Sequence, residues 1–155
     1  MKKSLFLLII ISLSTSYQEI NAQQNDKEEV ITAIEHLFDG MRANDSSKVA
    51  SVFTRDAIMQ TILQDQEGKT FLNNGDLAGF LKAVGTDKNE IWDEKITRYE
   101  IKIDGKLASA WTPYQFYRGE EFSHCGVNSF QLMNTDEGWK IFHIVDTRRK
   151  ENCID

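Results

Sequence analysis

The stretch from Phe122 to Arg148 constrains the fold of this chain more than any other. Two segments with strand-like alternation, residues 122–132 and 139–148, flank a turn rich in Asn, Asp and Gly, which is typical of a β-hairpin. Because side chains alternate across a strand, every second residue of the first segment shares one face. That face carries large apolar residues with two polar ones among them: Phe122, His124, Gly126, Asn128, Phe130 and Leu132. We therefore expect this face to form the floor of an apolar pocket that contains polar groups.

The first half of the chain has the periodicity of helices. Over residues 25–42, apolar side chains recur at three- and four-residue spacing, which predicts a helix with one buried stripe and a capping box at its start. A second, short helix is expected to be capped by Asp45 or Ser46 and to run through Phe53. A third is expected over residues 77–84, after a capping segment rich in Asn and Asp.

Strands are expected over residues 57–63, 70–72, 94–103 and 107–118, in addition to the hairpin. Pro113 lacks a backbone N–H, so it predicts a bulge or a sheet edge at its position. Helices followed by antiparallel strands indicate an α+β fold, in which the N-terminal helices pack on one face of the sheet. We expect a strongly curved antiparallel sheet whose concave face, covered by these helices, encloses a cone-shaped cavity.

The N-terminus has the organisation of a secretory signal peptide. Lys2 and Lys3 precede an apolar run, residues 5–13, and a more polar segment leads to Ala22, where we expect cleavage. The run is shorter than the ~20 residues that a permanent membrane anchor needs. The prediction is therefore a signal peptide, residues 1–22, and a single domain, residues 23–155, exported to the periplasm or secreted without a membrane anchor.

The net charge limits the classes of binding partner, and the cysteines bear on the cellular compartment. The net charge is −6, and loss of the signal peptide leaves an acidic domain without a basic stripe, which argues against nucleic acid as a partner. Export permits a disulfide between the two cysteines, Cys125 and Cys153. In the folded hairpin Cys125 lies opposite roughly Arg148, so the tail need only turn back to form the bond. Two unpaired thiols are the alternative. Without a CxxC motif, a disulfide here has a structural role.

The order of these elements resembles the nuclear transport factor 2-like (NTF2-like) superfamily, in particular its exported bacterial SnoaL-like members. Four stretches carry the resemblance: LFDGMRAND at 37–45, VFTRDA at 52–57, the strand at 111–117 and GWKI at 138–141. It implies an α+β cone over nearly all of the mature chain. The superfamily includes isomerases, dehydratases and cyclases as well as binding and dimerisation modules, so the fold does not select a function. Its enzymes generally place acid–base residues inside the cone.

His124 is the sharpest candidate for acid–base chemistry, because the pKa of an imidazole can be tuned close to neutrality. The register of the last strand decides its partner, since a slip by one residue exchanges the two faces. If Asp146 points inward, it can pair with His124 and raise the imidazole pKa. If His143 points inward instead, Asp146 forms a solvated ion pair with Arg148. We favour Asp146. The alternative for both His124 and Asn128 is that they satisfy buried backbone groups.

A further set of side chains could line the pocket and contact a flat, largely apolar ligand through rings with polar tips. Its members are Trp92, Trp111, Tyr114, Tyr117, Asn128 and His143. For the aromatic residues, a place in the hydrophobic core is the alternative.

No cofactor is expected. The histidines at 36, 124 and 143 lack zinc-type spacing, and no phosphate loop, GxSxG elbow or cysteine–histidine arrangement predicts covalent chemistry. Three functions remain. The first is binding of a small, largely apolar molecule. The second is cofactor-free acid–base catalysis of the isomerase, dehydratase or cyclase type, with His124 and Asp146 or a tyrosine. The third is a non-catalytic interaction module, a homodimer formed through the sheet.

Overall fold

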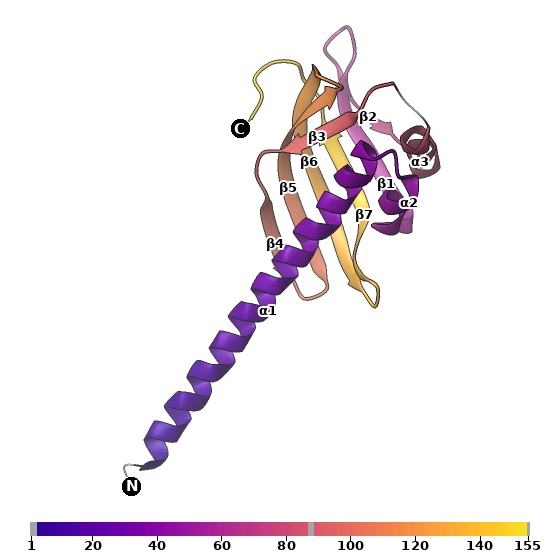
Figure 1. The fold of residues 1–155 in the computed structure, drawn as a ribbon. Coiled ribbons are helices and arrows are strands. Elements are labelled where there is room, and N and C mark those ends of the chain that lie inside the picture. Colours follow the sequence, from indigo (N-terminus) through magenta and orange to yellow (C-terminus); the bar gives the residue numbers. More distant parts are fainter. Residues whose placement is uncertain (1–2, 87–88, 155) are drawn as a thin grey trace.

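The computed structural model describes residues 3–86 and 89–154, with side chains from Gln23 onward. Three helices lie before or between strands: α1 (Lys3–Arg42), α2 (Ser46–Ser51) and α3 (Leu77–Gly85). The strands are β1 (Phe53–Gln64), β2 (Thr70–Asn74), β3 (Trp92–Ile96), β4 (Glu100–Asp104), β5 (Leu107–Arg118), β6 (Glu121–Thr135) and β7 (Gly138–Thr147). Within the described residues they form one seven-stranded sheet in the order β2-β1-β7-β6-β5-β3, with β4 also paired to β5 (Figure 1).

The sheet is mixed rather than purely antiparallel, which corrects the sequence-based expectation. β1 runs parallel to β7, whereas the other paired strands are antiparallel. A parallel pair needs a long connection, and residues 65–137 separate these two strands. Residue alternation is the same in parallel and antiparallel strands, so the sequence pattern could not reveal this direction. The predicted α+β architecture with a curved sheet is otherwise confirmed.

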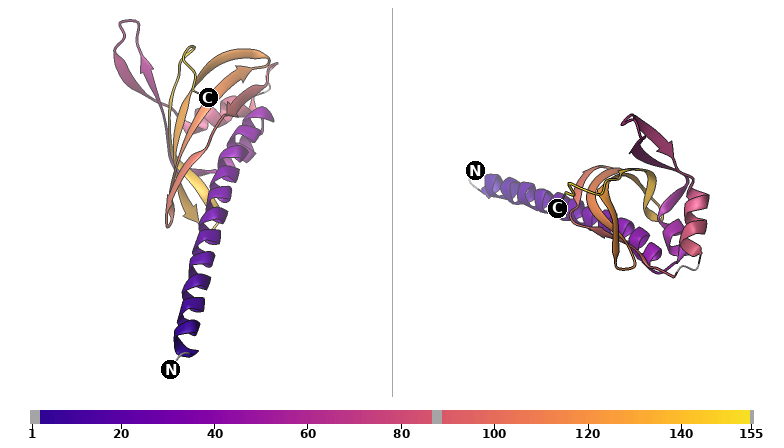
Figure 2. Two further views of the ribbon diagram at one scale, coloured as in Figure 1. Left: turned by 90° about the vertical axis from the view of Figure 1, so that its left-hand side faces the viewer. Right: turned by 90° about the horizontal axis from the view of Figure 1, so that it is seen from above.

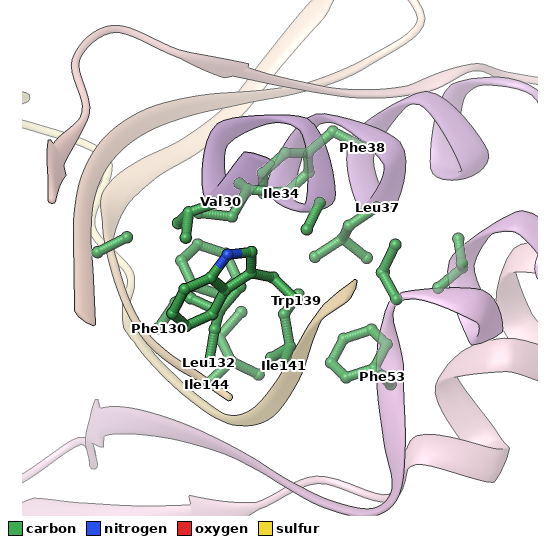
Figure 3. Packing of buried hydrophobic residues seen from close by; sticks show 14 of the residues in the cluster. Val30, Ile34, Leu37, Phe38, Phe53, Phe130, Leu132, Trp139, Ile141 and Ile144 are labelled. Atoms are coloured by element: carbon green, nitrogen blue, oxygen red, sulfur yellow. The ribbon is translucent and has the colours of Figure 1, made fainter. Parts of the chain in front are cut away.

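Helix α1 crosses the concave side of the sheet and continues well beyond it (Figures 1 and 2). Its buried stripe points at the sheet, where Trp139 and the neighbouring strand residues meet it (Figure 3). The labelled core residues are Val30, Ile34, Leu37, Phe38, Phe53, Phe130, Leu132, Trp139, Ile141 and Ile144. Burial of this many large apolar side chains supplies the main favourable term for docking the helix.

The start of α1 differs from the prediction. The helix does not begin at a capping box at Asn25 but passes through it, and the Asn25 side chain donates to Glu29 Oε1 at 2.8 Å on the helix surface. Residues 1–2 of the expected signal peptide lie outside the described residues, and 3–22 belong to α1. Cleavage after Ala22 stays a prediction. In the described part of the chain, no helix is both long and apolar enough to cross a membrane.

The two short helices are capped as expected. The Asp45 carboxylate accepts the Lys48 N–H at 2.9 Å, and the Asp76 carboxylate accepts the Gly79 N–H at 2.7 Å. Such caps satisfy backbone donors that the first helical turn leaves unpaired. Helix α2 ends at Ser51, so Phe53 opens strand β1 rather than closing the helix.

The strand expected over residues 94–103 is divided into β3 and β4 by residues 97–99. The break lies opposite Pro113. Thr97 donates its N–H to the Pro113 carbonyl at 3.0 Å, but the reciprocal bond cannot form because proline has no N–H. The expected irregularity at Pro113 is therefore present, and it falls on the neighbouring strand rather than within β5.

Two bulges decide which side chains of the hairpin face the cavity. Ser123 is the extra residue between the pairs Phe116–His124 and Tyr117–Phe122, so Phe122 leaves the inner face and is 42% exposed, contrary to its predicted place. Phe142 is extra between the pairs Leu132–Ile141 and Gln131–His143. A single inserted residue exchanges the faces of a strand. Buried residues that come before Phe142 in the sequence and buried residues that come after it can therefore face the same, inner side of the sheet.

The disulfide between Cys125 and Cys153 is confirmed, with the two Cα atoms 5.7 Å apart. Backbone hydrogen bonds of 2.8 and 2.9 Å pair Cys125 with Arg149, one residue beyond the expected Arg148. The disulfide thereby fixes the segment that follows β7, which includes Arg148.

Candidate functional site

A cavity of about 680 Å³ opens on the concave side of the sheet, between α1, α3 and the strands. Most of its wall is apolar and includes Leu37, Phe38, Met41, Met59, Phe80, Trp92, Phe116 and Ile144. A polar group interrupts this wall, formed by Glu94, Tyr114, His124, Asn128, Asp146 and Arg148. We call these six residues the polar cluster.

Glu94 contributes a carboxyl group in an apolar setting. It lies in the middle of β3 between Trp92 and Ile96, opposite Phe116 of β5. Its Oε1 accepts a hydrogen bond of 2.7 Å from Asn128 Nδ2. Burial raises the pKa of Glu94 to about 8, and the charge of Asp146 adds to this rise, while the Asn128 hydrogen bond opposes it. Glu94 is therefore protonated at neutral pH.

Asp146 is the second carboxyl group of the polar cluster. Its Oδ2 accepts from Arg148 Nε at 2.8 Å and from the Tyr114 hydroxyl at 3.2 Å. Burial tends to lower the pKa of Arg148, but the hydrogen bond and charge of Asp146 outweigh it and the pKa rises. Burial raises the pKa of Tyr114, and the nearby carboxyl groups of Glu94 and Asp146 add to that rise. The cluster thus combines an ion pair with a protonated acid.

His124 lies on the cavity wall but is not paired with Asp146 as predicted. Among the described residues its ring is in contact with Tyr114 and Phe116, and its Nδ1 lies 3.1 Å from Ser123 Oγ. Burial lowers the pKa of His124 and the positive charge of Arg148 lowers it further, whereas Asp146 opposes the fall. The predicted rise is therefore wrong in direction, because burial disfavours the imidazolium and Arg148, rather than His124, pairs with Asp146.

The inner position of Asp146 and the outer position of His143 follow from the Phe142 bulge. Asp146 pairs with Asn128 across the hairpin and is buried. His143 Nε2 lies 3.0 Å from Gln60 Oε1 and is not part of the cavity wall. The register that the sequence left open thus has Asp146 inward, and the proposed ligand contact of His143 is not supported.

The predicted aromatic wall is only partly correct. Trp92 and Tyr114 line the cavity. Trp111 is 48% exposed, because Thr112 and Tyr114 occupy the inner face of β5 and residue 111 points the other way. Tyr117 packs on Phe122 with ring centroids 5.7 Å apart, away from the cavity wall. Neither Trp111 nor Tyr117 is in the lining of this cavity.

Glu94 and Arg148 were not identified as site residues from the sequence. A signal for Glu94 existed, since Trp92 and Ile96 stand two residues before and after it and should share its face. A signal for Arg148 existed as well, since it stands two residues after Asp146 and should share its face. Its contact with Asp146 was considered only as a solvated ion pair.

Gly126 permits the close approach on which Tyr114 depends. A Cβ atom at this position would lie 1.8 Å from the Thr147 carbonyl oxygen and 2.9 Å from the Tyr114 ring. The Tyr114 hydroxyl donates to that same carbonyl at 3.0 Å. Glycine is the residue that allows backbone and ring to meet here.

The described residues contain no group of three or more His, Cys, Asp or Glu side chains that could hold a metal ion. The chemistry that the cluster can carry is hydrogen bonding and proton transfer. It offers a protonated carboxyl, a neutral imidazole, a phenol and an ion pair around one cavity.

Comparison with solved structures identifies the fold as the NTF2-like, cystatin-like α+β fold. An NTF2-like protein with a cystatin-like fold from Novosphingobium aromaticivorans matches with a TM-score of 0.69, at 12% identity over 86% of this chain and 88% of its own. A protein provisionally named scytalone dehydratase from the same organism matches with a TM-score of 0.69, at 11% identity over 88% and 92%.

A third similar structure is the β subunit of a provisionally named aromatic-ring-hydroxylating dioxygenase from Novosphingobium aromaticivorans. It matches with a TM-score of 0.68, at 14% identity over 84% of this chain and 94% of its own. No family model and no curated protein matches the sequence. Likeness at this level of identity establishes the fold, and function must be argued from the site.

Proposed function

We propose that the cavity binds one small, largely apolar molecule whose polar end meets the polar cluster. The observation that carries this proposal is the position of Glu94, Asn128 and Asp146 together in a wall that is otherwise mostly apolar. Binding sites for small molecules generally combine an apolar lining with a few polar groups that orient the ligand. The volume of about 680 Å³ lies within the ~300–1,000 Å³ usual for such sites.

The chemistry of the cluster indicates what the polar end contains. A protonated Glu94 can donate a hydrogen bond, so a carbonyl or hydroxyl oxygen is a suitable partner. Leaving such a buried donor unpaired costs about 1–3 kcal/mol. A ligand that pairs with it should therefore bind more tightly than a purely apolar ligand.

A pair of neighbouring residues on β1 provides the test. Met59 lines the cavity, whereas Ile58 points to the other side of the strand and is 53% exposed. N-phenyl-1-naphthylamine, a neutral apolar dye, should fluoresce with the wild-type protein and with Ile58→Trp. Met59→Trp should weaken the signal, because the indole occupies part of the cavity. The reverse pattern would place the dye on the outer face and contradict the proposal.

Native mass spectrometry of protein purified without denaturant complements the dye. A compound that co-purifies with the wild-type protein and with Ile58→Trp, but not with Met59→Trp, would identify the class of ligand.

A second candidate, cofactor-free acid–base catalysis, is favoured by the protonated Glu94 and the neutral His124 in the lining of one cavity. Contrasting protonation of titratable groups in one cavity is typical of general acid–base pairs. In a dehydration, Glu94 would give its proton to a departing hydroxyl while His124 Nε2 takes the proton of the adjacent C–H. The C–O and C–H bonds break, a C=C bond forms and water leaves. Proton transfer from His124 to Glu94 through water restores both groups.

Two similar structures carry dehydratase names, both provisional, which supports testing this reaction class. With a co-purified hydroxy compound as substrate, Glu94→Gln should retain binding and lose turnover, as followed by mass spectrometry of the dehydrated product. Equal turnover by Glu94→Gln and wild type would eliminate this mechanism.

We also propose that the chain is exported. The disulfide between Cys125 and Cys153 supports this location, because such bonds persist in oxidising compartments. N-terminal sequencing of the protein recovered outside the cytoplasm should begin at Gln23. Recovery of the uncleaved chain from the cytoplasm alone would contradict it.

A further inference from the structure

An ion-pair network at the C-terminal end of α1 connects the helix to the strand that carries Glu94. Arg42 Nη2 contacts Asp39 Oδ1 at 2.5 Å, within the same helix. Arg42 Nη1 contacts Asp93 Oδ1 at 3.1 Å and the Glu94 carbonyl oxygen at 3.4 Å, both on β3. Lys48 of α2 completes the network through Asp39 Oδ2 at 3.1 Å.

Strand β3 needs such support because it is short and lies at the end of the sheet. Among the described residues it pairs only with β5, over the five positions from Trp92 to Ile96. The ladder is then interrupted opposite Pro113. The backbone of Glu94 is therefore held by β5 on one side and by Arg42 on the other.

The guanidinium group suits this position better than an ammonium group would. Its planar fork can contact a carboxylate and a carbonyl at the same time, and Asp39 one turn earlier fixes its orientation. Arg42 stays charged, because the carboxylates of Asp39 and Asp93 raise its pKa although burial alone would lower it.

We propose that Arg42 is a positioning residue, which holds β3 against α1 so that the Glu94 carboxyl group stays in the cavity. This inference rests on the proposed function for the importance of Glu94. The contacts of Arg42 with β3 fall on Asp93 and on Glu94 itself, so loss of Arg42 acts on Glu94 directly. A brace that only stabilised the domain would affect unfolding without changing the surroundings of that carboxyl group.

Arg42→Gln tests the proposal, with Lys48→Gln as its matched control. Both cations contact Asp39, and their side chains are 37% and 35% exposed. The ion pair of Lys48 is with Asp39 of α1, whereas Arg42 also pairs with Asp93 of β3. Neither variant alters the side chains that interact with the Glu94 carboxyl group, which are Asn128, Tyr114, Asp146 and Arg148. The first readout is the titration of the Glu94 carboxyl carbon by ¹³C NMR.

In the wild type and in Lys48→Gln, the midpoint should lie near 8. In Arg42→Gln it should fall by at least one pH unit toward the usual carboxyl value, as β3 moves and water reaches Glu94. Arg42→Lys should give an intermediate midpoint. The melting temperatures of Arg42→Gln and Lys48→Gln should fall by similar amounts. If Arg42→Gln does not fold, Arg42→Lys serves as the deciding variant.

The same midpoint in Arg42→Lys, Arg42→Gln and wild type would overturn the inference and leave Arg42 as a structural brace. The dye-binding assay separates this outcome from failure of the proposed function. If the wild-type protein does not bind N-phenyl-1-naphthylamine, the proposed function fails, while the titration still reports whether Arg42 positions Glu94. If the dye binds to the wild type, to Arg42→Gln and to Lys48→Gln, the cavity is intact in all three proteins and the Glu94 midpoint alone decides the inference.

Discussion

The side-chain amide of Asn128 donates a 2.7 Å hydrogen bond to the carboxyl group of Glu94. This contact joins the central strand β6 to β3, the strand at one end of the sheet, and passes across β5, which lies between them. The contact also affects the pKa of Glu94. Burial raises this pKa, whereas the hydrogen bond from Asn128 lowers it because it stabilises the charged carboxylate.

Asn128→Ala should raise the Glu94 pKa further above its value of about 8, because the hydrogen bond that favours the charged form is lost. It should also cost about 1–3 kcal/mol of stability, since Glu94 loses a buried partner. The ¹³C titration of Glu94 and urea unfolding measure the two effects. Ser129→Ala, one residue along on the other face of β6, should change neither. A lower midpoint in Asn128→Ala would contradict this assignment.

Glu94 should make the protein less stable as the pH rises. Its folded-state pKa of about 8 is above the unfolded value, so between these values the native state binds a proton that the unfolded state has lost. The free energy of unfolding should therefore fall with a limiting slope of about 1.4 kcal/mol per pH unit. The slope applies from the unfolded pKa up to about 8 and then ends.

His124 has the opposite effect, because its lowered pKa makes the unfolded state the better proton binder below about 6.5. Between pH 6.5 and 8, the pH dependence of the free energy of unfolding therefore reports on Glu94 and not on His124. Urea unfolding should show the slope in the wild type and a flat profile for Glu94→Gln. Equal slopes for the two proteins would show that Glu94 titrates normally.

The sequence predicts the helices and strands better than it predicts which side chains of the β6–β7 hairpin face the cavity. The helical stripe of α1, the caps at Asp45 and Asp76 and the strand that contains Pro113 follow from local rules that involve few residues. Bulges at Ser123 and Phe142 do not. Each inserts one residue, and neither leaves a distinct pattern, so strict alternation misplaces Phe122 and leaves the register of Asp146 open.

The candidate site shows the same limit. His124 and Asn128 were found because they alternate with apolar residues along β6, and Tyr114 and Trp92 because they are aromatic residues with polar tips. The pKa of His124 was predicted in the wrong direction, because burial lowers it and the positive charge of Arg148 lowers it further. The position of the Arg148 charge relative to His124, 24 residues earlier in the chain, leaves no periodic signal in the sequence.

Arg148→Met should raise the pKa of His124 toward the usual imidazole value. Arg148 lowers that pKa through its positive charge, and its removal also leaves the opposing charge of Asp146 less compensated. The titration of the His124 Cε1 proton by NMR gives the midpoint. Arg149→Met is the control, since Arg149 contacts the Asn152 carbonyl in the tail instead. An unchanged midpoint in Arg148→Met would show that burial alone sets the pKa.

Loss of the disulfide should destabilise the protein by about 3 kcal/mol. The bond closes a segment with a sequence separation of 28 residues, and a loop of this length restricts the unfolded chain by roughly that free energy. Cys153→Ser is the suitable variant, because Cys125 is fully buried and a hydroxyl there would add its own cost. Urea unfolding of Cys153→Ser should match that of the reduced wild type.

The same variant should loosen the tail that carries Arg148, so the His124 midpoint should move in the direction expected for Arg148→Met, by a smaller amount. Reductant should have no further effect on Cys153→Ser, which serves as the internal control. Loss of stability without any change at His124 would mean that β7 alone holds Arg148 against Asp146.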